Sequence, residues 1–437
     1  MPDNFLPIWQ TITDGWIKIW PVLLQILEDW WWVPALLVFF NLFKQLYFYY
    51  ISEKWDASMA NILLEIKVPK DVERPIRVME HVFANLWSIF DPPNWKEKWI
   101  EGHFLLSFSF EIAGIDGVPH FYIRTREIFR KLVESSIYAQ YPEAEISKVE
   151  DYTKNVPQDI PNKEWDLFGT SFKFGRSEVY PIKTYTKFFE EKVETKEEKR
   201  LDPLSSLMDG IASLGPGEQV WVQIVAKPIT ISGSDKSKDL EEEGKKLVDK
   251  LVKRPEKKSQ KPILQEAAET MIFGSQKKEE KPERLTSPEM DLTPGEKEAV
   301  RAIEEKIAKV MYDCTVRFIY LGKRDVFLKP LVRIPFSFFN SMATVNLNAF
   351  RVEKPTLTKV TYFFKKRRVY LKQRRLFRYY QKRLPPYFPL PGGTIALNIE
   401  ELATMWHLPS KSAAPGPTLL RVQAKKGEPP AGLPVEE

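Results

Sequence analysis

One apolar stretch, from Trp30 to Tyr50, constrains the fold of this chain more than any other (WWWVPALLVFFNLFKQLYFYY). Its centre carries no charge, and Asn41 is the only polar side chain between Val33 and Phe43. As a helix the stretch would extend about 30 Å, which is the thickness of a bilayer's hydrocarbon core. Tryptophans begin it and tyrosines end it, as is typical of the two membrane–water interfaces. We therefore expect a transmembrane helix over 30–51. A buried core helix is the alternative, because it is also apolar on every side.

The basic residues around this stretch predict its orientation. Upstream there is only Lys18, whereas downstream the chain carries Lys54, Lys67, Lys70, Arg74 and Arg77. Because cytoplasmic flanks of membrane helices are enriched in Lys and Arg, we expect the N-terminus outside and the C-terminal domains in the cytoplasm. This predicts a single-pass protein of the bacterial inner membrane. In the extracytoplasmic residues 1–29, the shorter apolar run from Trp16 to Leu27 predicts an interfacial helix, with a second span as the alternative.

Cysteine, histidine and motif content give no sign of catalysis. Cys314 is the single cysteine, so an internal disulfide and a cysteine zinc site are excluded, and a reducing compartment is favoured. The four histidines are scattered without metal-ligand spacing. The sequence has no GxxxxGK followed by Ser or Thr and no HExxH. We expect a protein that is not an enzyme, with no catalytic residues, no metal and no cofactor.

Residues 60–155 predict strands and helices in the order β-α-β-β-α-β. Ile62 to Val68 indicates a buried strand, the alternation of apolar residues over 104–112 indicates a strand with one buried face, and apolar residues at three- and four-residue spacing indicate the helices. Asp116-Gly117 predicts a hairpin turn between the two middle strands. This order is the ferredoxin-like arrangement, with two helices on one face of a four-stranded antiparallel sheet. The predicted elements are strand 62–68, helix 76–90, strands 104–112 and 118–124, helix 128–137 and strand 144–149.

Residues 156–355 predict a second ferredoxin-like unit, so the expected fold class is α+β with two such units after the transmembrane helix. Its insertion, 232–294, is rich in Lys, Glu, Ser and Pro, and we expect it to be disordered. The insertion is interpreted as a solvated spacer or a partner site, with candidate short helices at 240–252 and 263–273. The other predicted elements are strands 165–174, 181–185, 219–229, 314–321 and 348–352, and helices 204–214, 296–311 and 327–344.

The clearest candidate site lies in a basic helical segment and adaptor, 356–409, which precedes a proline-rich tail, 410–437. Its cations are interleaved with Tyr370, Phe377, Tyr379 and Tyr380. Basic side chains neutralise phosphates and aromatic rings stack on bases, as binding of single-stranded nucleic acid requires. An anionic lipid surface or an acidic protein partner would fit equally well. The candidate binding residues are Lys365, Lys366, Arg367, Arg368, Lys372, Arg374, Arg375, Arg378, Lys382 and Arg383.

Three strings resemble a known family, in the same order along the chain. They are Gly217–Gln223, Phe338–Phe350 and Thr394–Pro409 (TIALNIEELATMWHLP). Each is similar to the region ahead of the ATPase core in conjugation and type IV secretion ATPases, including HerA-like and coupling-protein relatives. The likeness covers roughly residues 60–437. It implies a membrane-anchored accessory region beside a motor that moves DNA or protein. No residue matches the motor's phosphate-binding loop, so the motor is expected as a separate chain, or as lost from a split copy.

The sequence therefore predicts a non-catalytic, membrane-anchored accessory protein of a DNA-translocation machine of the type IV secretion or conjugation kind. Its expected partners are the membrane, DNA, a separate P-loop motor and further copies of the chain. The alternative is an envelope scaffold protein whose basic segment binds anionic lipid instead of nucleic acid.

Overall fold

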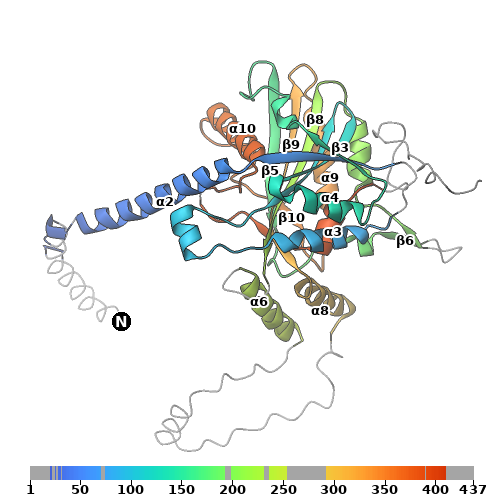
Figure 1. Cartoon of the computed structure of the whole chain (residues 1–437), viewed down its shortest axis with the longest axis horizontal. Helices are drawn as coiled ribbons and strands as arrows, with labels where there is room; N and C mark the ends of the chain where they lie inside the picture. The colour runs from blue at the N-terminus through green and yellow to red at the C-terminus, as the bar shows by residue number, and fades with distance from the viewer. Residues whose placement is uncertain are drawn as a thin grey trace, which may run out of the picture. The chain divides into compact units, whose positions relative to one another are not determined.

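The computed structural model of the chain describes residues 20–21, 25, 28–30, 32–69, 74–191, 198–230, 236–252, 292–388 and 390–409 (Figure 1). The chain divides into two compact units. Unit 1 comprises Met1–Met59 with Pro92–Phe104, and unit 2 comprises Ala60–Asp91 with Leu105–Glu437. The predicted helices at 16–27 and 263–273 and the proline-rich tail lie mostly or entirely outside the described residues.

Unit 1 is built on helix α2 (Trp32–Ser58), which packs against the π-helical turn η2 (Glu97–Glu101). The Lys44 ammonium lies 4.9 Å from the centre of the Trp99 ring. The Phe48 ring lies edge-on to the Trp99 ring, with 5.5 Å between the two ring centres. Gly102 ends the turn with a φ of 78°, and a Cβ there would lie 2.5 Å from the Ile51 carbonyl carbon. Only glycine allows this backbone conformation and this close approach together.

The predicted transmembrane helix over 30–51 is wrong. Among the described residues no helix combines the length and the apolar character that crossing a membrane requires. The helix continues to Ser58 and takes up Glu53, Lys54 and Asp56, and its Lys44 packs on an aromatic ring of the same unit. The predicted single-pass location in the inner membrane and the predicted orientation both depended on this transmembrane helix, so they are wrong as well. Large apolar side chains such as Phe39 nevertheless stay exposed on α2.

Unit 2 contains one antiparallel sheet, with nine strands among the described residues. The strand order is β10-β5-β9-β8-β2-β3-β1-β4, and β11 pairs with β9 beyond the end of β5. A separate hairpin pairs β6 (Phe189–Glu191) with β7 (Glu198–Arg200). The strands of the large sheet are β1 Asn61–Lys67, β2 Phe108–Ile115, β3 Val118–Arg126, β4 Glu145–Val149, β5 Trp165–Phe174, β8 Glu218–Ile229, β9 Met311–Lys323, β10 Phe350–Val352 and β11 Ile395–Asn398.

The helices of unit 2 cover both faces of this sheet. One face buries the larger apolar core under α3, α4, α5, α9 and α11. The other face carries α10 over a smaller core, and α6 and α8 pack on that same face near the ends of β8 and β9. Their bounds are α3 Val78–Leu86, α4 Arg130–Tyr138, α5 Ser205–Ala212, α6 Lys236–Leu251, α8 Pro294–Ile307, α9 Arg333–Ser341, α10 Lys365–Lys382 and α11 Ile399–Met405, with 3-10 turns at Trp87–Ile89, Glu127–Phe129, Tyr152–Lys154, Tyr185–Lys187 and Lys329–Val332.

The structure is α+β, but the prediction of two ferredoxin-like units is wrong because the strands of both halves form one sheet. The halves join where β2 pairs with β8, from Phe108 opposite Ala226 to Ile115 opposite Gln219. Both faces of β8 are buried, with Trp221 on one face and Val222 on the other at most 1% exposed, so β8 could not serve as a solvated edge. The strand predicted at 181–185 is irregular backbone that ends in a 3-10 turn.

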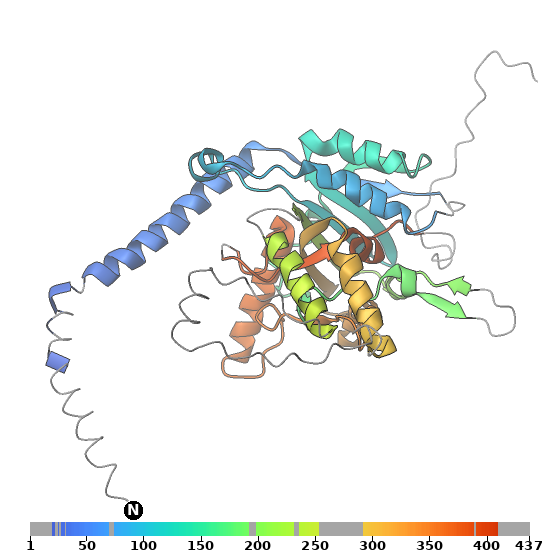
Figure 2. The same cartoon turned by 90° about the horizontal axis from the view of Figure 1, so that it is seen from below.

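Two local predictions meet different outcomes. Asp116 and Gly117 have φ angles of 50° and 85°, as a two-residue type I′ hairpin requires, so the predicted turn is confirmed. The expected disorder of the insertion does not hold throughout, because the structure has a helix at the place of the candidate short helix at 240–252. Residues 236–251 of the insertion form α6, which lies beside α8 (Figure 2) and buries Leu240 and Val248. Residues 253–291 lie outside the described part of the chain.

A buried ion pair connects α8 to the C-terminal helix α11. The Lys306 Nζ atom lies 3.0 Å from Glu401 Oε2, and the side chains are 1% and 0% exposed. Lys306 also donates to the Ala396 carbonyl at 2.9 Å. Glu401 and Asn398 form a capping box at the start of α11. The pair therefore joins the helix after the insertion to the strand and helix near the end of the described chain.

Replacing Lys306 by Met should destabilise unit 2 by about 3–5 kcal/mol, because the Glu401 carboxylate would stay buried without a cation. The measurement is urea denaturation followed by tryptophan fluorescence. The matched control is Lys297→Met in the same helix, where the lysine is exposed; it should change the free energy of unfolding by less than about 0.5 kcal/mol. Equal effects of the two substitutions would contradict this account of the pair.

Candidate functional site

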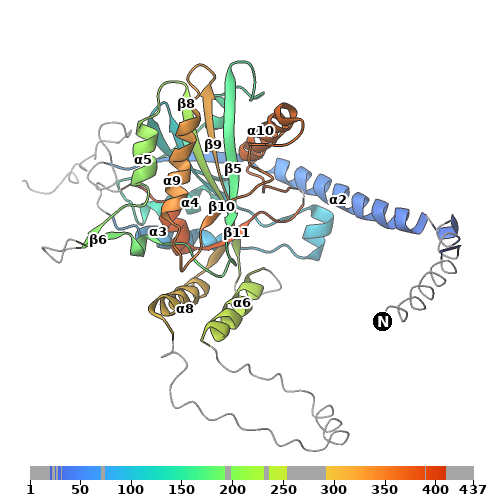
Figure 3. The ribbon, with the colours of Figure 1, turned by 180° about the vertical axis from the view of Figure 1, so that it is seen from behind.

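Helix α10 is amphipathic and packs on the smaller core of the sheet (Figures 1 and 3). Leu376, Phe377 and Tyr380 recur at three- and four-residue spacing and are buried. The Tyr380 ring lies 5.4 Å from the ring of Trp221 on β8. Because the apolar side faces the sheet, the polar side of the helix faces outward. This arrangement decides which of the predicted binding residues reach solvent.

The outer side of α10 carries exposed cations that we call the basic face. α10 contains no acidic residue, and none of these cations forms an ion pair with a carboxylate of a described residue. Arg374, Arg378 and Lys382 follow one another at four-residue spacing, where like charges repel by about 0.2–0.5 kcal/mol per pair. The face therefore favours an anionic ligand that would relieve this repulsion. It consists of Lys365, Lys366, Arg367, Arg368, Arg374, Arg375, Arg378 and Lys382.

Tyrosine rings hold several of these guanidinium groups in place. Arg374 lies over the Tyr370 ring at 5.6 Å and donates to its hydroxyl at 2.8 Å. Arg375 lies over the Tyr379 ring at 5.4 Å. These contacts are cation–π interactions, and they leave the planar groups exposed at defined positions along the helix. The tyrosines thus orient the cations instead of neutralising them.

Two of the predicted binding residues have structural roles and do not belong to the basic face. Lys372 is half-buried, and its ammonium donates to the carbonyls of Lys354 and Leu357 at 3.2 and 3.1 Å. Arg383 is buried directly after α10. Sequence reasoning could not separate these two from their neighbours, because both continue the basic run.

Arg383 attaches the C-terminal end of α10 to the centre of the sheet. Its guanidinium donates to both carboxylate oxygens of Glu111 on β2, at 2.9 and 3.1 Å, and it also pairs with Asp151. The Arg383 and Glu111 side chains are 3% and 0% exposed. Arg383 has a φ of 55°, a left-handed conformation that is costly for a residue with a side chain. The buried ion pair holds the residue in this conformation at the end of the helix.

Further polar groups complete the environment of Glu111. The Tyr152 hydroxyl donates to Glu111 at 2.7 Å, and Gln223 donates to Glu111 at 3.0 Å and to the Tyr380 carbonyl at 3.1 Å. Burial by itself would raise the pKa of Glu111, but the charge and hydrogen bonds of Arg383, together with the hydrogen bonds from Ser109 and Tyr152, outweigh it. The pKa of Glu111 therefore lies below its ordinary value.

A second buried arginine lies near this network. Arg317 on β9 is fully buried and donates to the Leu384 carbonyl, while its Nε and Nη1 atoms have no hydrogen-bond partner among the described residues. Burial lowers the pKa of Arg317 to about 10. Together, Arg317 and Arg383 hold the chain that leaves α10 against the sheet.

The aromatic residues take roles that the sequence did not predict. Phe377 and Tyr380 are buried, so they are not available to stack on a ligand. Tyr362, Phe363 and Phe364, which immediately precede α10, are exposed by 54%, 86% and 77%. We call these three residues the aromatic tip. Their position directly before four consecutive cations was a signal in the sequence that could have identified them.

The other candidate sites in the described part of the chain lack the ionisable side chains that acid–base catalysis or metal binding requires. Within the described ranges no group of His, Cys, Asp and Glu side chains could hold a metal ion.

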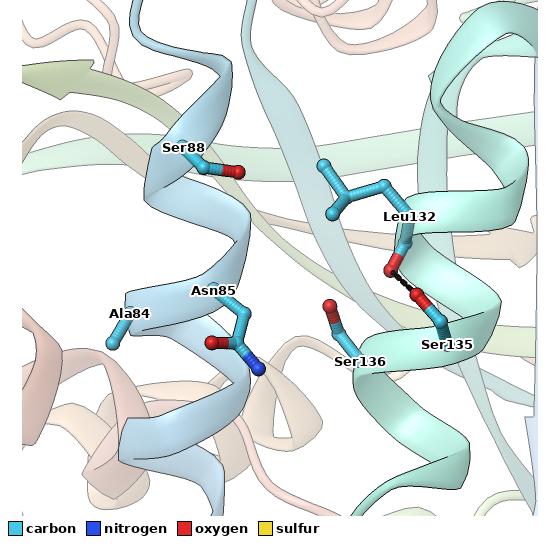
Figure 4. Close-up of a pocket in the computed structure, with 6 residues that line it drawn as sticks. All are labelled: Ala84, Asn85, Ser88, Leu132, Ser135 and Ser136. Carbon is cyan, nitrogen blue, oxygen red and sulfur yellow. Dashed lines mark hydrogen bonds between the residues drawn. The ribbon is translucent and has the colours of Figure 1, made fainter.

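A hollow of about 310 Å³ lies between α3 and α4 (Figure 4). Its lining contains no ionisable side chain, and the hydrogen bond drawn there joins Ser135 to the Leu132 carbonyl at 3.1 Å. The lining residues are Ala84, Asn85, Ser88, Leu132, Ser135 and Ser136.

The pKa of Glu111 predicts an acid-sensitive attachment of α10. As the pH falls below about 4.3, the unfolded state takes up a proton that the folded state does not yet bind, so the free energy of unfolding decreases. Glu111→Gln should remove this contribution and flatten the pH dependence by up to about 1.4 kcal/mol per pH unit. The measurement is denaturant unfolding between neutral and acidic pH. Glu143→Gln, at an exposed position, should keep the wild-type slope; a wild-type slope in Glu111→Gln would refute this role.

The family comparison covers most of the region just described. The family model called Domain of unknown function (DUF8128) matches residues 96–414, which is more than half of the chain. The match includes α10, Glu111 and the strands that carry the buried network, and it begins after β1 and α3. No curated protein matches the sequence. The chain therefore belongs to the DUF8128 family.

Proposed function

We propose that this protein binds nucleic acid through the basic face of α10. In this proposal it is a non-catalytic accessory component of a DNA-translocation machine of the type IV secretion or conjugation kind. ATP hydrolysis is supplied by a P-loop motor outside these 437 residues, since no phosphate-binding loop occurs within them. The membrane-spanning anchor expected from the sequence is not part of the proposal.

The observation that carries the proposal is a row of exposed cations without acidic partners. From Lys365 to Lys382 the helix extends roughly 26 Å, with exposed cations in its first turn and again from Arg374 to its C-terminal end. A phosphate backbone is a polyanion of matching form, and each neutralised phosphate releases counterions. Most of these cations are arginines, whose planar guanidinium groups form bidentate hydrogen bonds with phosphate.

The attachment of α10 to the sheet also supports the proposal. Buried apolar residues hold the inner side of the helix, and Lys372 and Arg383 hold it near its middle and at its C-terminal end. A ligand that binds the outer side therefore meets cations already in position, and little conformational entropy is lost on binding. Leu371 is the only large aliphatic side chain exposed on α10. A lipid surface would favour more apolar contact along the helix.

The accessory role rests on the three strings that resemble conjugation and type IV secretion ATPases. They lie in or around β8, α9 with β10, and β11 with α11, all of which belong to the unit that carries α10. Their residues are mainly packing residues. Trp406, for example, is 1% exposed and donates to the Glu111 carbonyl at 3.2 Å. A gene for a P-loop motor next to the gene for this protein would support the role further.

The proposal predicts salt-dependent binding of the full chain to a labelled oligonucleotide, measured by fluorescence anisotropy from about 50 to about 200 mM salt. Arg374→Gln/Arg378→Gln should weaken binding and lower the slope of log K against log salt by about 1.4 for a single strand, because two phosphate contacts are lost.

The charge-matched control is Lys131→Gln/Arg333→Gln, which removes two exposed cations from α4 and α9 on the other face of the sheet. It should leave the affinity and the slope unchanged. Circular dichroism verifies that both double variants are folded. No binding at the lowest salt concentration, or equal losses in the two variants, would refute the proposal.

A further inference from the structure

We propose that the aromatic tip, Tyr362, Phe363 and Phe364, stacks on unpaired bases, so that the ligand of α10 is single-stranded nucleic acid. This inference rests on the proposed function and adds the class of ligand. It assigns a binding role to residues outside the candidate set derived from the sequence.

The first support is the exposure of the tip. Phe363 and Phe364 are 86% and 77% exposed, and they are adjacent in the chain. Single exposed apolar side chains are common on protein surfaces, whereas neighbouring exposed rings often mark a binding site. Each ring offers a flat face, and stacking on a base tolerates any sequence because every base has such a face.

The second support is the backbone at Phe364. This residue has a φ of 56°, a conformation that bulky side chains rarely adopt. Its carbonyl accepts the Arg368 N–H at 3.0 Å, which begins the first turn of α10. The helix therefore starts directly after the exposed rings. Unfavourable backbone conformations of this kind concentrate at binding sites, where the surrounding structure maintains them.

The third support is the arrangement of charge around the tip. Lys365, Lys366 and Arg367 follow the rings without a gap, and the Arg368 guanidinium lies 4.9 Å from the centre of the Tyr362 ring. One short segment thus offers stacking surfaces and phosphate contacts together. An unpaired strand presents both its bases and its phosphates to such a segment, whereas a duplex keeps its bases stacked inside.

Anionic lipid is the competing ligand, because aromatic and basic residues also occur together at membrane surfaces. Two observations favour nucleic acid. The exposed rings other than Tyr370 lie directly before α10, and most of the exposed side of the helix consists of cations over a length of several nucleotides of one strand. The guanidinium groups of Arg374 and Arg375 lie 5.6 and 5.4 Å from the centres of tyrosine rings, and guanidinium groups suit planar contacts to phosphates and bases.

The test compares the full-length wild type with Phe363→Leu/Phe364→Leu and Phe363→Tyr/Phe364→Tyr. The leucine variant keeps apolar side chains and removes the rings, and the tyrosine variant keeps the rings. Affinities are measured by anisotropy for a single-stranded oligothymidylate and for a duplex of the same length. Flotation with phosphatidylserine vesicles is the third measurement.

We expect the wild type to prefer the single strand. The leucine variant should lose at least about tenfold in affinity for the single strand, and its affinity for the duplex should not change. The tyrosine variant should bind both ligands as the wild type does. If the wild type binds both nucleic acids and the leucine variant binds the single strand equally well, this inference is wrong while the proposed function stands.

Two other results would overturn the inference together with the proposed function. If the wild type binds neither nucleic acid at low salt, the proposed function fails and the inference fails with it. If vesicles capture the wild type and neither protein binds the single strand, the ligand is anionic lipid and the inference fails. Circular dichroism of each variant shows whether a loss of binding reflects a loss of folding.

Discussion

The buried ion pair between Arg383 and Glu111 is the interaction on which the candidate site depends. It joins the end of α10 to a central strand, in a place where neither charge is solvated. Replacing a buried ion pair by apolar residues often costs nothing, so its value here is not simply stability. Its consequence is geometric: a helix with repelling cations on its outer side is held at one position and one rotation against the sheet. The hydroxyl of Tyr152 and the amide of Gln223 complete the environment of Glu111.

The sheet makes this attachment possible because its two faces differ in character. One face is mainly apolar and is closed by helices over a single large core. The other combines a smaller apolar core with buried polar residues such as Glu111, Gln223 and Arg317. Because side chains alternate along a strand, β2 contributes Phe110 and Ile112 to the first face and Glu111 to the second. The first face thus supplies most of the apolar burial, and the second orients α10.

Local patterns predicted local structure well. The strand patterns of β1 and β2, the turn at Asp116-Gly117 and the amphipathic pattern of α3 and α4 agree with the structure, because each depends on residues close in the chain. The predictions failed where distant segments meet. Lys44 contacts Trp99, which no local pattern in the apolar stretch reveals. The pairing of β2 with β8 likewise joins segments about a hundred residues apart, and it converts two expected units into one sheet.

The sequence by itself determined that one segment would be strongly basic, free of acids and interrupted by aromatic residues, since charge and side-chain type are properties of the chain alone. Only the tertiary structure decided which of those residues face solvent. Phe377 and Arg383 are buried because the helix packs with that side on the sheet, and Arg374 and Arg378 are exposed because they lie on the other side. The three most exposed rings, Tyr362, Phe363 and Phe364, lie before the helix, and Tyr370 within it is less exposed. The physical reason is that burial depends on the rotation of α10 against the sheet, which contacts between distant residues set.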